Sequence, residues 1–87
     1  MTKVSFDDVP PKSSTVTSYD ERHAGTYLRL LDAESAGADW REVVMVLFGL
    51  DPVNEPERSR LIYDGHLARA RWMRDSGFKH LLRPQGH

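Results

Sequence analysis

The sequence predicts a small all-α domain with the layout of a helix-turn-helix protein: three main helices plus a short C-terminal turn or helix. Three observations predict it. Apolar residues recur at helical spacing in three segments, capping side chains precede those segments, and glycines follow them. The connection LDPVNEP before the third segment is longer than the usual turn, so we expect an extended-turn variant. An ordinary small helical bundle fits the same spacing.

The first helix is expected from Ser18 to about Ala36. Ser18 and Glu21 have the spacing of a capping box, and Gly37 can supply the left-handed residue that ends a helix. A helix-period stripe on this segment is the predicted core face, with Leu30 beside it: Ala24, Tyr27, Leu28 and Leu31.

The second helix is expected to start at Asp39, three residues before Glu42, and to run through WREVVMVLF to Gly49. Its predicted core face consists of Trp40, Val43, Val44 and Leu47. The run VVMV has high strand propensity, but the caps at both ends and the lack of a partner strand favour a helix.

The third helix is expected to be capped by Asn54, with Pro56 in its first turn, and to end at Gly77. The following FKHLLRP predicts a short final turn whose apolar residues close the core. The predicted organisation is a flexible arm over residues 1–17, a helical domain over residues 18–83 and a tail over residues 84–87. A proline pair and a Ser/Thr run indicate the arm.

The third helix has apolar residues on two sides. At about 100° per residue, one narrow stripe is the expected core face: Leu61, Gly65, Ala68 and Trp72. The far side is also largely apolar, with Ile62, Tyr63, His66, Leu67, Ala70 and Met73. A helix apolar on both sides is covered on both sides. Either FKHLL folds back over the far side, or that side is a patch for another protein.

Four arginines flank the stripe, Arg58 and Arg69 on one side and Arg60 and Arg71 on the other. Long basic side chains at the edge of a buried stripe usually lay their methylenes over the core, and this is favoured here over phosphate contact. Residues 1–56 carry ten acids and five bases, and residues 57–87 carry three acids and seven bases, so the net charge is −1. A dedicated DNA-binding domain normally has a basic excess.

Cysteine is absent and no apolar run approaches the ~20 residues of a membrane span, so we expect a cytoplasmic protein. We expect no cofactor and no metal, because the histidines lack a recognised ligand spacing: His23, His66, His80 and His87. No nucleophile elbow or phosphate loop occurs, so an enzyme is not expected.

Residues 19–82 resemble the bacterial domain-of-unknown-function family numbered 2285. The resemblance rests on Arg22-His23, Leu30-Leu31-Asp32-Ala33, Trp40-Arg41-Glu42-Val43, Leu47-Phe48-Gly49, Gly77-Phe78 and Leu81-Leu82. It implies an extended-turn helix-turn-helix fold found in regulators of conjugative transfer on integrative and conjugative elements. Some of those regulators are activators whose copy of the domain binds DNA through a basic face.

A solitary, slightly acidic copy implies an antiactivator. It would bind the N-terminal domain of an FseA-like transcriptional activator and block its conjugative transfer genes, with a TraR-like, LuxR-type quorum-sensing activator as a second partner. DNA binding is not expected, because Asp64, Gly65 and His66 stand on the third helix. The expected docking residues, which would also fit the core, are His23, Tyr27 and Leu30, then Tyr63, Leu67 and Met73.

The alternative is a DNA-binding helix-turn-helix regulator that uses the basic C-terminal half. Its contacts would be Arg69, Arg71, Arg74, Lys79 and Arg83. A third hypothesis is an oligomerising structural domain, which would self-associate as the free protein.

Overall fold

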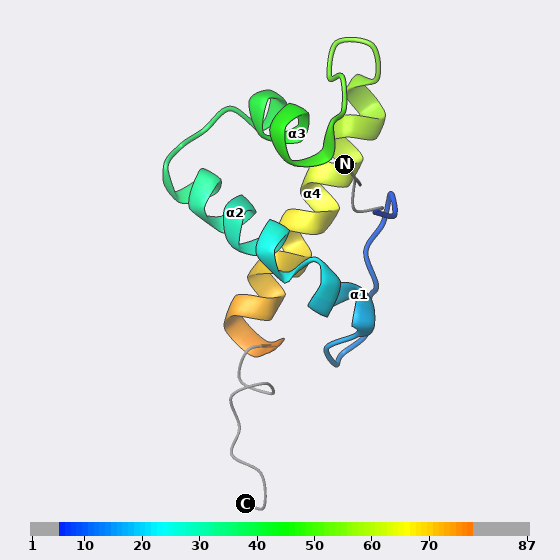
Figure 1. The fold of residues 1–87 in the computed structure, drawn as a ribbon, viewed down its shortest axis with the longest axis vertical. Helices are drawn as coiled ribbons and strands as arrows, with labels where there is room; N and C mark the ends of the chain where they lie inside the picture. The colour runs from blue at the N-terminus through cyan, green and yellow to red at the C-terminus, as the bar shows by residue number, and fades with distance from the viewer. Residues whose placement is uncertain (1–5, 78–87) are drawn as a thin grey trace, which may run out of the picture.

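The computed structural model describes residues 6–77, and Figure 1 shows how its helices are arranged. The elements in chain order are α1 (Ser18–Arg22), α2 (Ala24–Ser35), α3 (Trp40–Phe48), α4 (Pro56–Trp72) and the π-helical turn η1 (Met73–Gly77). This range contains no strand, which confirms the predicted all-α class. The expected final turn in FKHLLRP and the tail 84–87 lie outside the described residues. No helix of residues 6–77 is both long and apolar enough to cross a membrane.

Local stop and start signals act as predicted around α3. The Asp39 carboxylate accepts a hydrogen bond from the Arg41 backbone N–H at 2.9 Å, which caps the first turn. Gly49 ends the helix with a left-handed φ of 65°, and Gly37 has a φ of 74° after α2. Pro56 is the first residue of α4.

Two predicted caps are different in the structure. The capping box of α1 consists of Thr17 and Asp20, one residue before the expected pair. The predicted cap of α4, Asn54, donates instead to Asp51 within the preceding turn, and Glu55 stands at the N-cap position. The expected single first helix is broken at His23, whose φ of −106° and ψ of 13° separate α1 from α2.

The core lies where α2 and α3 pack against α4, the long helix that crosses the molecule (Figure 1). The α4 side chains on this face are the apolar set expected on its far side: Ile62, Tyr63, Leu67, Ala70 and Met73, together with His66. The predicted stripe is wrong as the core face, since Leu61 is 51% exposed. On α2, Leu28 is likewise exposed, and Leu30 is fully buried in its place.

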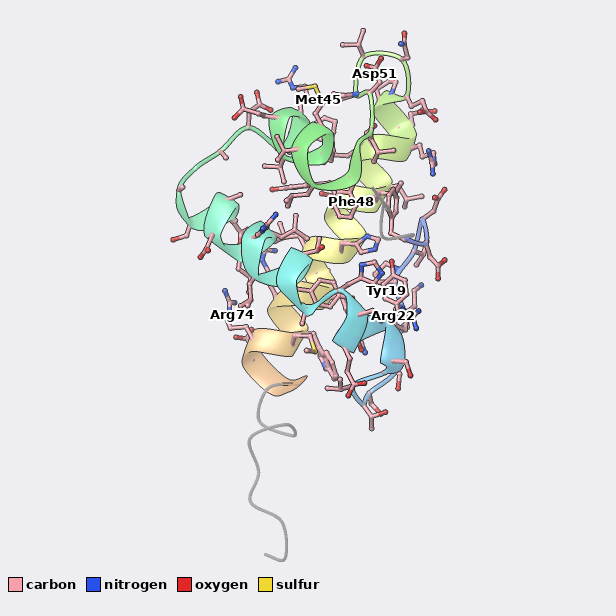
Figure 2. The ribbon with its side chains drawn as sticks, viewed as in Figure 1. Tyr19, Arg22, Met45, Phe48, Asp51 and Arg74 are labelled. Atoms are coloured by element: carbon pink, nitrogen blue, oxygen red, sulfur yellow. The ribbon has the colours of Figure 1, made fainter. Side chains whose placement is uncertain are left out.

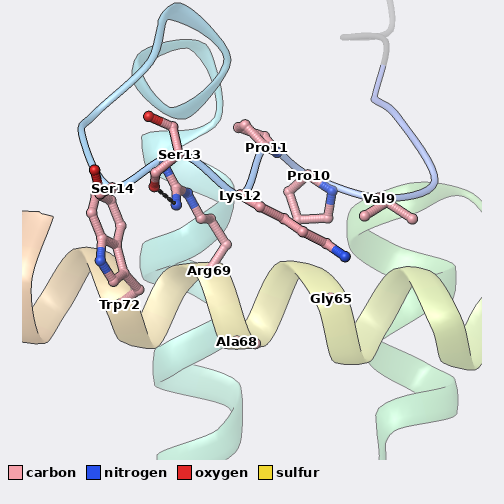
Figure 3. A pocket seen from close by; sticks show the side chains of 10 residues that line it. All are labelled: Val9, Pro10, Pro11, Lys12, Ser13, Ser14, Gly65, Ala68, Arg69 and Trp72. Atoms are coloured by element: carbon pink, nitrogen blue, oxygen red, sulfur yellow. Dashed lines mark hydrogen bonds between the residues drawn. The ribbon is translucent and has the colours of Figure 1, made fainter.

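The N-terminal strap, residues 6–16, covers a second side of α4 (Figure 3). Pro10 is buried over Gly65, where an added Cβ would lie 3.1 Å from the proline Cδ. The strap and α4 enclose an open cavity of about 480 Å³. The strap has no helix, as expected. It packs on the helical domain, whereas a flexible arm was predicted. Both apolar sides of α4 are thus contacted, one by α2 and α3 and the other by the strap.

His66 ties the strap to the core. Its Nδ1 donates to the Ile62 carbonyl at 2.8 Å, so the 2.7 Å contact at Nε2 is a hydrogen bond donated by the Tyr19 hydroxyl. The same hydroxyl accepts a hydrogen bond from the Asp7 backbone N–H at 2.9 Å. Phe6 packs edge-on against Phe48, with ring centroids 5.0 Å apart. Burial lowers the pKa of the His66 imidazole and raises the pKa of the Tyr19 hydroxyl.

Candidate nucleic-acid interface

Two exposed arginines lie beside a half-buried tryptophan and a buried tyrosine where the start of α3 meets the first turns of α4. The guanidinium of Arg60 lies 5.0 Å from the Trp40 ring centroid and 5.6 Å from that of Tyr63. Arg41 approaches the same tryptophan from α3, at 5.9 Å. Ring stacking orients both guanidinium groups while leaving their N–H donors in solvent.

One face of α4 is covered by neither the core nor the strap. It carries Glu57, Arg60, Leu61, Asp64 and Arg71, all exposed, and is bordered by the exposed Ala68, which also lines the cavity under the strap. The two arginines on it are 11 positions apart, which is about 16 Å along the helix. Arg60 donates to Asp64 at 3.1 Å, and Arg71 donates to Glu34 of α2 through its Nε at 3.2 Å. Both pairs are solvent-accessible, so each arginine can exchange its carboxylate for another anion at little cost.

Arg58 and Arg69 belong to the side of α4 that the strap covers. Arg58 makes a forked contact with the Asp8 carboxylate, 3.1 Å at its shortest, and a second ion pair with Glu55. Hydrogen bonding to Asp8 raises the pKa of this guanidinium. Asp8 of the strap therefore neutralises the charge of Arg58.

Arg69 is buried and forms an ion pair with Asp20 of α1, at 2.6 Å between Nη2 and Oδ2. It also donates to the Ser13 carbonyl at 2.7 Å, the dashed line in Figure 3, and to that of Thr15 at 3.0 Å. Burial favours the protonated form of Asp20, but hydrogen bonds from Arg69, Thr17 and Tyr27 outweigh it and lower the carboxyl pKa to about 2. Arg69 thus holds the fold together and is not available to a nucleic acid.

The other residues predicted for DNA contact have different outcomes. Arg71 lies on the exposed face of α4. Arg74 is also exposed, points outward from the side of the helix near its C-terminal end (Figure 2) and donates to the neighbouring Asp75 at 2.8 Å. Lys79 and Arg83 lie outside the described residues. The structure therefore places Arg71 on the same face of α4 as Arg60, and places Arg41 near Arg60; neither Arg60 nor Arg41 was in the predicted set.

All six residues predicted to dock a protein partner are buried. Their exposed fractions are 8% or less: His23, Tyr27, Leu30, Tyr63, Leu67 and Met73. They occupy the interfaces that α4 makes with the rest of the domain. In this structure these residues therefore belong to the core, and they present no surface to another protein.

The site residues that were not predicted, Arg60 and Arg41, are only partly indicated by the sequence. Arg60 and Arg71 share a flank at helical spacing, and Asp64 lies four positions after Arg60. The proximity of Trp40 and Arg41 depends on how α3 packs on α4, which spacing does not reveal. Among residues 6–77, no group of histidine and carboxylate side chains is placed to hold a metal ion.

An exposed helix face bearing arginines on a small helical domain is a feature of DNA-binding transcription regulators. A family model described as "T6SS, Transcription factor, DNA binding domain" matches residues 2–83. The chain belongs to this family of DNA-binding domains, RovC_DNA-bd. No curated protein matches the chain.

This family match overturns two expectations. The assignment to the family numbered 2285, and with it the identification of a QseM-like antiactivator, is wrong, because the matching model is that of a transcription factor DNA-binding domain. The expectation that the domain does not bind DNA is wrong for the same reason, and nothing supports an FseA-like or TraR-like partner. The net charge was a poor guide to DNA binding, because some of the acids do not lie on the exposed face of α4. Asp8 and Asp20 neutralise arginines on the side that the strap covers.

Proposed function

We propose that this domain regulates transcription by binding duplex DNA, with the exposed face of α4 in the major groove. The observation that carries the proposal is the placement of Arg60 and Arg71 on one solvent-facing side of a long helix, about 16 Å apart. That span corresponds to about five base pairs at 3.4 Å each. Arg41, at the start of α3, lies beside this face and would contact a backbone phosphate.

The side chains of this face suit base-edge recognition. Arginine binds the O6 and N7 acceptors of guanine, a carboxylate such as that of Asp64 accepts from the cytosine amino group, and the methyl of Ala68 fits the thymine methyl. Because the ion pairs of Arg60 and Arg71 are exposed, each contributes less than about 1 kcal/mol and can be exchanged for contacts to DNA. Recognition of this kind requires no catalytic group.

Binding to a pool of random-sequence duplexes, measured by fluorescence anisotropy over a range of salt concentrations, tests the proposal. Each phosphate contact contributes about −0.9 to the slope of log affinity against log salt. Arg41→Ala should reduce the slope by about one unit. Arg60→Ala and Arg71→Ala should lower affinity most for sequences selected from the pool.

Arg22→Ala is the matched control, since Arg22 is an exposed arginine on α1 (Figure 2), a helix that contributes no residue to the proposed face. Its affinity and salt slope should equal those of the unsubstituted protein. The proposal fails if the protein does not bind duplex DNA at low salt. It also fails if the α1 substitution weakens binding as much as those on α4.

A further inference from the structure

A groove between α2 and α3 lies on a side of the domain to which α4 contributes no lining residue. Its volume is about 190 Å³. The floor is apolar and consists of Ala33, Ala38, Val43, Val46 and Leu47. Arg29 of α2 and Glu42 of α3 complete the lining, one charge from each helix.

The groove includes the most solvent-exposed large apolar residue of any helix in the described part of the chain. Val46 is 75% exposed, and its neighbour Met45 is 50% exposed. The side of α3 that faces the core is already buried through Val44 and Phe48. A helix that is apolar on both faces is usually covered on both faces, and the nine-residue α3 has this pattern.

The charges of the groove indicate what covers it. Arg29 and Glu42 are both exposed, and neither forms an ion pair with any residue of the range 6–77. In a two-fold symmetric interface, a residue on one copy meets its complement on the other, and the contact occurs twice. A surface that carries one free cation and one free anion around an apolar centre is therefore complementary to itself.

We propose that this groove binds a second copy of the chain, with Val46 at the centre and Arg29 of each copy paired with Glu42 of the other. Because no α4 residue lines the groove, the proposed DNA-reading faces stay free in the dimer. If the proposed DNA binding also holds, the two faces would read two half-sites related by two-fold symmetry. Self-association itself does not depend on DNA, so either proposal can fail alone.

Sedimentation equilibrium of the full 87-residue protein without DNA is the first test. The unsubstituted protein should show a concentration-dependent dimer, and Val46→Lys should be monomeric with unchanged helical circular dichroism. Val53→Lys is the matched control, because Val53 is 83% exposed but does not line the groove. It should dimerise normally. The proposal is overturned if the unsubstituted protein stays monomeric at its solubility limit, or if both valine variants dimerise equally.

Charge reversal tests the pairing. Arg29→Glu and Glu42→Arg should each weaken dimerisation roughly tenfold or more, because like charges then face each other twice. A mixture of the two variants should form a heterodimer, since every facing pair is again one acid and one base. A pair within one copy cannot give this result. If the mixture associates no better than either variant alone, the two-fold pairing is wrong.

Discussion

The carboxylate of Asp20 and the guanidinium of Arg69 form a buried ion pair that joins α1 to α4, although 49 residues separate them in the sequence. The Tyr27 hydroxyl donates to the same carboxylate at 2.9 Å. The guanidinium also lies 3.9 Å from the ring centroid of Trp72. This pair fixes the N-terminal segment against the long helix.

Arg69→Ala should lower the free energy of unfolding by about 3–5 kcal/mol, because it leaves a buried carboxylate without its partner. Urea denaturation measures the change. Arg71→Ala is the control: its exposed ion pair with Glu34 contributes less than about 1 kcal/mol. If Arg69→Ala does not fold, Arg69→Lys should give an intermediate loss, since lysine keeps the charge without the planar fork. Equal stability of the Arg69 and Arg71 variants would contradict this assignment.

The low pKa of Asp20 makes stability depend on acid. Its value falls from 3.8 to about 2 in the folded state, so the unfolded chain takes up the proton first as the pH drops. The contribution, about 2 kcal/mol, is present above pH 4 and is lost as the pH falls toward 2. Urea denaturation across this range should show a steeper decline for the unsubstituted protein than for Asp20→Asn. Parallel curves would rule out this source of acid sensitivity.

His66 should make a second pH-dependent contribution. Burial lowers its pKa below 6.5, so the unfolded chain binds the proton more readily than the folded one. The contribution of His66 is therefore present above pH 6.5 and decreases as the pH falls through the folded pKa. An NMR titration of the imidazole should give a midpoint below 6.5, and His66→Phe should remove this part of the pH dependence. A midpoint at or above 6.5 would be inconsistent with a buried, neutral imidazole.

Asp64→Asn separates two consequences of an acidic residue on the proposed DNA-reading face. Removing the carboxylate frees Arg60 and reduces repulsion of phosphate, so affinity for random-sequence duplexes should rise severalfold. If Asp64 accepts from cytosine, discrimination at one base pair should fall at the same time, by about 1–3 kcal/mol. Glu21→Gln, on α1, is a matched change of charge and should alter neither quantity.

Two helical glycines provide a paired test of the strap. An alanine Cβ at Gly25 of α2 would meet nothing within 4 Å, whereas at Gly65 it would lie 3.1 Å from Pro10. Gly25→Ala should therefore stabilise the protein by about 0.5–1 kcal/mol. Gly65→Ala should gain less or lose stability, because the strap must shift. Equal gains in urea denaturation would mean that the strap does not press on α4.

Local signals in the sequence were sufficient for most helix boundaries. Asp39, Gly37 and Gly49 act through the backbone of their own neighbours, so their roles can be inferred without knowing the rest of the fold. The break at His23 lacks such a signal. It accompanies the burial of Asp20, whose carboxylate is committed to Arg69 of a distant helix.

The faces of α4 could not be assigned from periodicity, because apolar residues follow two of its sides. Which side meets α2 and α3 is decided by packing among distant segments, and Leu61 and Ile62 show the result: the first is exposed and the second fully buried. The same ambiguity affected the candidate site, because the exposed arginines cannot be identified until the buried side of α4 is known. Three of the predicted DNA contacts lie within residues 6–77. Arg69 is buried, so only Arg71 and Arg74 of these three are accessible.

The strap also constrains the order in which the chain can fold. Its contacts to Arg58 and Arg69 span 50 to 56 positions of sequence, so these contacts cannot form until α4 exists. Closing so long a loop carries an entropic cost that only a formed helix can offset. During synthesis, residues 6–16 leave the ribosome before α4 does, yet they reach their final position only after Arg69 has emerged. The strap thus settles only after the helix that it covers.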